Sequence, residues 1–124
     1  MKEFKLIPEA RELILLHLLQ ENFLNEERFA KSFARGKFRI KKWGKNRIVR
    51  ELKFRDISAY NIKSALKEIE EKEYLKTIFE ITEKRNEVIS EGNQYKRKKK
   101  LIDFLLRKGY ETDLIFKTVA EVLS

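Results

Sequence analysis

The chain has 124 residues, 42% of them apolar, and a single proline, which suits one small domain or a short array of helical repeats. Its formal net charge is +9 and it has no cysteine, so disulfides, thiol catalysis and cysteine-ligated zinc are excluded. No apolar run reaches the ~18–20 residues of a membrane-spanning helix or resembles a secretory signal, so we expect a cytoplasmic protein.

The positive charge is concentrated in two segments. Residues 31–50 contain nine basic residues and no acid, and residues 95–100 contain five more, again without an acid. The rest of the chain has more acids than bases. Because ordinary surfaces intersperse the two signs, this distribution indicates binding to a polyanion or to an acidic surface.

Strong helix formers dominate, and the pattern predicts an all-α protein. A first helix is expected from Pro8, which suits an initial turn, to about Asn22. Apolar residues at positions 14–16, 18 and 19 surround most of this helix, so we expect a further element or a second copy to cover it. Leu15, Leu18 and Leu19 would then mediate weak self-association.

A second helix is predicted from an N-cap at Asn25 to Trp43, with Gly44 ending it in the left-handed C′ position. Apolar residues recur along it at steps of four and three, which predicts a buried stripe. This stripe consists of Phe29, Phe33, Gly36, Ile40 and Trp43.

The remaining pattern predicts four more helices, over residues 45–55, 58–69, 73–90 and 94–108, and a last one from 112. Ser58 is the expected N-cap of the second of these, and Val88 is placed on the buried side of the third. A shift of 53 residues superimposes Ile48 on Leu101 and Leu52 on Leu105, together with the turns that follow. The sequence therefore predicts two copies of a three-helix unit after one extra N-terminal helix.

Three segments resemble one known family. Residues 22–30 (NFLNEERFA) and 43–52 (WGKNRIVREL), the latter followed by Asp56, Ile57 and Ser58, are similar to signatures of the RecX regulators. Residues 104–110 (FLLRKGY) resemble the family's C-terminal repeat. The resemblance implies stacked three-helix repeats that bind the RecA recombinase filament on single-stranded DNA and inhibit it, in the control of recombination and repair.

The resemblance also implies a division of the chain. Residues 1–22 correspond to the last helix of a first repeat, residues 23–70 to a repeat with a basic face, and residues 71–124 to a further repeat. The glycines expected before Phe23 and Ile57 are Asn22 and Asp56, both of which tolerate a left-handed turn.

The candidate binding residues are the cations opposite the apolar stripe and on the following helix, which we expect to form one continuous basic surface. They are Arg28, Lys31, Arg35, Arg39, Lys42, Arg47, Arg50 and Lys53. Phe38 lies on the same side, where it would either stack on a base or pack against a neighbouring repeat. The run at 95–100 would be a second phosphate contact or a solvated helix start; its candidates are Lys96, Arg97, Lys99 and Lys100.

No motif indicates catalysis, a cofactor or a metal. His17 is the only histidine and has no second ligand at metal-binding spacing, and the acids at 70, 71 and 73 have no partners in any motif. The alternative function is an independent DNA-binding module of helix-turn-helix type, with residues 58–69 as the reading helix. That helix would present Tyr60, Asn61, Lys63 and Lys67 but no arginine, which argues against base readout.

Overall fold

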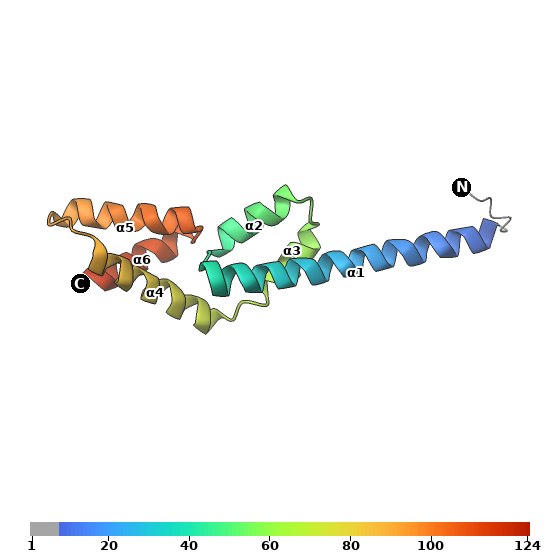
Figure 1. Ribbon diagram of the computed structural model, residues 1–124, viewed down its shortest axis with the longest axis horizontal. Coiled ribbons are helices and arrows are strands. Elements are labelled where there is room, and N and C mark those ends of the chain that lie inside the picture. The colour runs from blue at the N-terminus through green and yellow to red at the C-terminus, as the bar shows by residue number, and fades with distance from the viewer. Residues whose placement is uncertain (1–7) are drawn as a thin grey trace.

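The computed structural model describes residues 8–124, with side chains at position 17 and from residue 20 onward. Six helices and no strand occur in these residues (Figure 1). The helices are α1 (Pro8–Lys41), α2 (Lys45–Phe54), α3 (Ala59–Leu66), α4 (Glu71–Val88), α5 (Gln94–Lys108) and α6 (Thr112–Leu123). None of them, within this part of the chain, is both long and apolar enough to span a bilayer.

Helix α1 is continuous over 34 residues, so the predicted break between Asn22 and Asn25 was wrong. Asn25 lies exposed within the helix instead of capping it. An asparagine in a helix costs less than about 1 kcal/mol, and no glycine or proline accompanies it, so continuing the backbone hydrogen bonds is favoured. The N-terminal part of α1 extends beyond the other helices (Figure 1), and the apolar side chains at 14–16, 18 and 19 lie outside the described ones.

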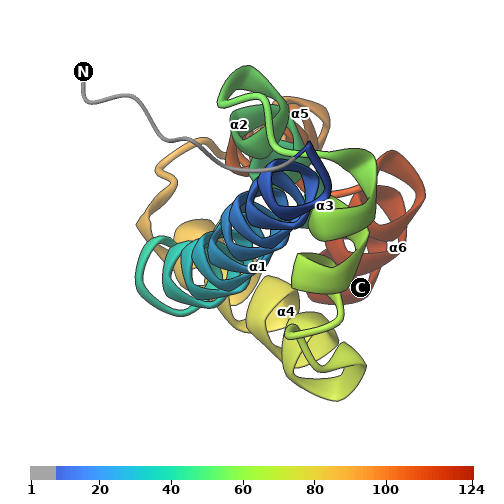
Figure 2. The same cartoon turned by 90° about the vertical axis from the view of Figure 1, so that its right-hand side faces the viewer.

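The buried side of α1 is not the predicted aromatic stripe. Ala30, Ala34 and Phe38 form it, and the helix packs mainly against α3. Small alanines let two helices approach closely, and this selects them over the larger apolar residues nearby. Phe29 and Ile40 of the predicted stripe are 45% and 78% exposed. Figure 2, viewed along α1, shows α2 and α3 on two different sides of it.

The two halves of the structure repeat, as the 53-residue shift predicts. Ile48 and Leu52 of α2 and the corresponding Leu101 and Leu105 of α5 are all fully buried. A left-handed residue follows each helix, Asp56 with φ 60° after α2 and its counterpart Gly109 with φ 95° after α5. Equivalent hydrogen bonds then close the turns: Ile57 N–H donates to Leu52 O at 3.1 Å, and Tyr110 N–H to Leu105 O at 3.2 Å.

The two units meet backbone to backbone at two glycines. Gly44 N–H donates to Lys108 O at 2.7 Å, and Asn46 N–H donates to Gly109 O at 2.9 Å. A Cβ on Gly44 would lie 2.3 Å from Gly109 O, so no other residue fits there without a shift. The prediction that Gly44 takes a left-handed C′ conformation was wrong, because its φ is −77° and Lys42 takes the positive φ instead.

Two buried tyrosines complete this junction. Tyr74 accepts from Lys45 N–H at 2.9 Å and donates to Glu111, while Tyr110 donates to Lys42 O at 2.9 Å. Their rings lie 5.3 Å apart, and Phe38 of α1 lies 5.7 Å from Tyr74. Burial raises the pKa of both phenols, so they stay protonated as donors. One core therefore runs through both units.

Glu26 joins α1 to the start of α3. Its carboxylate accepts from Ser58 N–H at 2.8 Å and from the side chain of Asn61 at 2.9 Å. Ser58 in turn accepts from Asn61 N–H at 3.2 Å, which confirms Ser58 as the predicted N-cap. The N–H of Ser58, and then the Asn61 amide, lower the pKa of Glu26.

We expect Glu26→Gln to destabilise the fold at neutral pH and to lose this effect in acid. A carboxylate whose pKa is lowered by folding stabilises the protein above its unfolded pKa, and the stabilisation disappears as pH falls through the folded value. The difference in free energy of unfolding between wild type and variant should therefore shrink from about pH 7 to about pH 3. Urea titrations measure it. Glu83→Gln, at an exposed site on α4, is the control, and an equal pH dependence in both variants would contradict the assignment.

Candidate partner-binding surface

One side of α1 carries a row of cations at steps of three and four. We call Arg28, Lys31, Arg35 and Arg39, with Lys42 just beyond the helix, the α1 basic side. Lys31 pairs with Glu27 at 3.6 Å, and Arg35 with Glu68 at 2.8 Å, which ties α1 to the segment after α3. Arg28, Arg39 and Lys42 are exposed and form no ion pair with any other described residue.

Phe38 is not a binding residue of this side. It is 2% exposed and packs on Tyr74, so it cannot reach a nucleic-acid base. Of the two interpretations that the sequence left open, packing against the neighbouring repeat is the one the structure shows. The reason is its position one and two turns after the buried Ala34 and Ala30, which places it on the same side of the helix.

A cluster of three aromatic residues, Phe29, Phe33 and Trp43, lies on another side of α1. Ring centroids are 5.7 Å apart between Phe29 and Phe33 and 6.2 Å apart between Phe33 and Trp43. Cations cover these rings: Arg47 lies 4.2 Å over Trp43 and Arg55 lies 4.8 Å over Phe33. Such pairs contribute about 0.5–1 kcal/mol each at exposed sites.

This arrangement places Arg47 away from the α1 basic side. Phe33 and Arg35 are two residues apart on one helix, so their side chains point to nearly opposite sides. Arg47 lies with the aromatic cluster and also donates to Arg107 O at 3.1 Å. Arg47 therefore lies apart from the α1 basic side and is a residue of the junction between the units. Arg50 and Lys53 of α2 are exposed.

A shallow hollow of about 270 Å³ lies along α1 beside the aromatic cluster. Gly36 lines it, and a Cβ there would meet nothing within 4 Å. Ile40 and Lys37 border it, and Lys37 lies 5.0 Å over Trp43. Lys37 was absent from the predicted binding residues although its spacing of four from Phe33 is visible in the sequence. Arg55 could not be found that way, since its contact depends on how α2 packs.

The basic run at the start of α5 has mixed roles. Arg97 donates to Asn86 O at 2.8 Å, to Asn86 Oδ1 at 2.7 Å and to Ile89 O at 3.0 Å. It satisfies the carbonyl end of α4, so its prediction as a phosphate contact is corrected to a structural role. Lys99 pairs with Asp103 at 3.2 Å on the surface. Lys96 is exposed, and Lys100 lies 4.0 Å from Glu91.

The structure also argues against α3 as a DNA-reading helix. Asn61, expected to face outward, is fully buried and bonded to Glu26. Tyr60 lies against Phe23 of α1, with ring centroids 5.8 Å apart. Among the described residues there is no metal-binding group of histidines and acids, and His17 pairs with Glu21 at 2.6 Å on the surface.

Two three-helix units that meet backbone to backbone, with an exposed basic side on α1, define a helical-repeat protein. Residues 25–66 match the family model "RecX, second three-helix domain", and residues 71–119 match "RecX, third three-helix domain". The chain therefore belongs to the RecX family of regulatory proteins.

Curated relatives agree with this assignment. The chain is similar to proteins named Regulatory protein RecX from Clostridium perfringens strain 13 and strain SM101, each 32% identical over 98 residues. The alignments cover 77% of this chain and 45% of each relative, so the chain spans less than half of the length of these relatives. No solved structure matches the chain.

Proposed function

We propose that this chain binds the RecA recombinase filament on single-stranded DNA and inhibits it, without catalysing a reaction itself. Membership of the RecX family supports the partner, and the α1 basic side supports the mode of binding. We assign that side to a unit of residues 23–70, with residues 71–124 as the second unit and residues 1–22 as an N-terminal extension. Weak self-association through Leu15, Leu18 and Leu19 is a separate expectation.

The single observation that carries the binding mode is the set of unpaired cations on α1. Arg28, Arg39 and Lys42 are exposed on the segment that contains the longest acid-free stretch of the chain. A second concentration of charge lies at the junction, where burial and then the charges of Arg47 and Lys41 lower the pKa of Lys108. Exposed cations in this density attract the phosphates of DNA or acids on a protein.

The test is the single-strand-dependent ATPase of RecA with and without this protein. We expect substoichiometric protein to slow ATP hydrolysis and strand exchange. The variant Arg28→Ala/Arg39→Ala/Lys42→Ala should inhibit less. Its matched control, Lys63→Ala/Lys67→Ala/Lys72→Ala, removes the same charge from exposed positions on α3, just after α3 and on α4, and should inhibit like wild type. Undiminished ATPase with wild-type protein would refute the proposal.

Binding should also weaken steeply with added salt. If the three free cations of the α1 basic side contact phosphates of single-stranded DNA, each lost contact lowers the slope of log K against log salt by about 0.7. The triple variant should therefore have a slope smaller by about 2. Fluorescence anisotropy over a salt series measures this on bare strand and on filament. An unchanged slope with the fold intact would assign these cations to solvation.

A further inference from the structure

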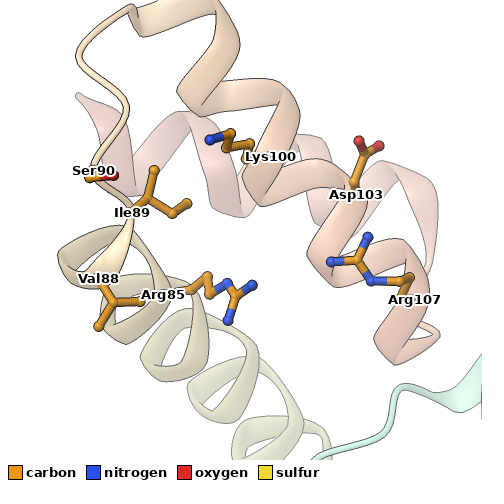
Figure 3. Close-up of a pocket in the computed structure, with 7 residues that line it drawn as sticks. All are labelled: Arg85, Val88, Ile89, Ser90, Lys100, Asp103 and Arg107. Carbon is orange, nitrogen blue, oxygen red and sulfur yellow. The ribbon is translucent and has the colours of Figure 1, made fainter.

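A cavity of about 430 Å³ opens between the end of α4 and the middle of α5 (Figure 3). Arg85 of α4 and Arg107 of α5 extend toward each other across it. Lys100 lies nearer the N-terminal end of α5. Val88 and Ile89 form an apolar wall near the end of α4. The prediction that Val88 is buried was wrong, because it is 71% exposed at this cavity.

The cavity is positively charged and its arginines are available. Arg85 and Arg107 form no ion pair with any described residue, and both are exposed. Asp103 is the only acid that lines the cavity; its carboxylate points away from both arginines and pairs with Lys99 at 3.2 Å. Two guanidinium groups therefore face the cavity without a counter-charge between them.

The surroundings prepare these groups for an anion. The guanidinium carbon of Arg85 lies 4.8 Å over the ring of Phe104, which restricts its orientation. The carbonyl end of α4 would otherwise repel an anion, but Arg97 donates to Asn86 O and Ile89 O there. Arg85 and Arg107 therefore offer their charges to the cavity, beside Lys100, which lies 4.0 Å from Glu91.

We propose that this cavity binds the phosphate of a nucleotide. A pair of guanidinium forks matches phosphate oxygens, with Lys100 as a further point charge, and the wall of Val88 and Ile89 accepts the flat face of a base. The volume lies within the range of about 300–1,000 Å³ typical of small-molecule sites. Free nucleotide and one nucleotide unit of single-stranded DNA share this chemistry. The proposal does not depend on RecA, because it concerns this protein alone.

The experiment is nuclear magnetic resonance of the full chain titrated with thymidine monophosphate, with a ten-nucleotide thymidine oligomer, and with thymidine as the phosphate-free control. We expect the phosphate ligands to shift the amide signals of residues 85–90 and 100–107, and thymidine to leave them in place. Shifts with both phosphate ligands would show that a free nucleotide is sufficient for binding to the cavity. Shifts with the oligomer alone identify the strand as the source.

Three variants test the assigned residues. Arg85→Gln/Arg107→Gln should weaken binding at least about tenfold, since it removes two charged hydrogen-bond donors. Asp103→Asn should tighten binding, a gain that a purely structural role would not produce. Lys63→Gln/Lys67→Gln, with the same loss of charge on α3 and at its C-cap, should bind like wild type. Absence of shifts with either phosphate ligand, equal shifts with thymidine, or unchanged affinity in the folded arginine variant would overturn the proposal.

Discussion

Replacing Gly109 with alanine is expected to lower the free energy of unfolding by about 2–5 kcal/mol. Two effects add. Gly109 has φ 95°, a conformation that costs other residues about 1–2 kcal/mol. The new Cβ would also lie 2.2 Å from Arg47 Cβ and 2.6 Å from Arg47 N, so the units would have to separate slightly. Out of a total stability of about 5–15 kcal/mol this is a large loss, measurable by urea denaturation.

Two further variants separate these effects. Gly44→Ala has no strain in φ, but its Cβ would lie 2.3 Å from Gly109 O, so it tests close approach alone and should cost about 1–3 kcal/mol. Gly92→Ala is the control, because nothing lies within 4 Å of its Cβ, and it should change stability by no more than about 0.5 kcal/mol. A neutral Gly44→Ala would show that the backbones do not interlock.

Leu52→Ala and Leu105→Ala should each cost about 2–5 kcal/mol, as at other fully buried leucines. These residues occupy the same position in the two units and both are fully buried. Leu106→Ala is the matched control, since Leu106 is the next residue of α5 and is 47% exposed. Thermal and urea unfolding of the three variants give the comparison.

A near-neutral result at Leu52 or Leu105 would contradict the equivalence of the two units. A loss at Leu106 as large as at Leu105 would instead place the buried side of α5 elsewhere.

Local signals predicted much of the fold. Ser58 caps α3 through its side chain, as predicted, for reasons contained within a few residues. The structure adds Asn93, whose side chain caps α5 in the same way, and Gly109, which ends that helix. The repeat was visible because the same turn and the same buried pair recur after 53 residues. Such features depend on neighbours along the chain, which the sequence displays directly.

The buried side of α1 was not predictable in this way. Apolar periodicity predicts that the largest apolar side chains are buried. In the structure α3 packs on Ala30 and Ala34 instead, because close approach of two helices needs small residues. Asn25 likewise has the residue type of an N-cap, but capping competes with a continuous helix, and only the complete fold decides between them.

The candidate site shows the same limit. Composition located the acid-free segments. It could not tell a cation that is free to bind a partner from one that already pairs with a carbonyl or a carboxylate of the same chain. Arg97 is occupied by carbonyls eight and eleven residues earlier in the chain, and Arg35 by Glu68. The cavity between α4 and α5 combines Arg85 and Arg107, which share no motif, so only the packing of two helices brings them together.

The junction between the units has a thermodynamic consequence. The first three amides of the α2 segment, at Gly44, Lys45 and Asn46, all donate to the second unit, and the carbonyls of Lys41 and Lys42 accept from its side chains. The start of α2 therefore has no side-chain cap of its own, and residues of the second unit accept from its first amides. Each unit supplies hydrogen-bond partners to the backbone of the other, so we expect the pair to unfold as a single cooperative unit. Free energy gained by a ligand on α4 and α5 is then shared with the helices that carry the α1 basic side.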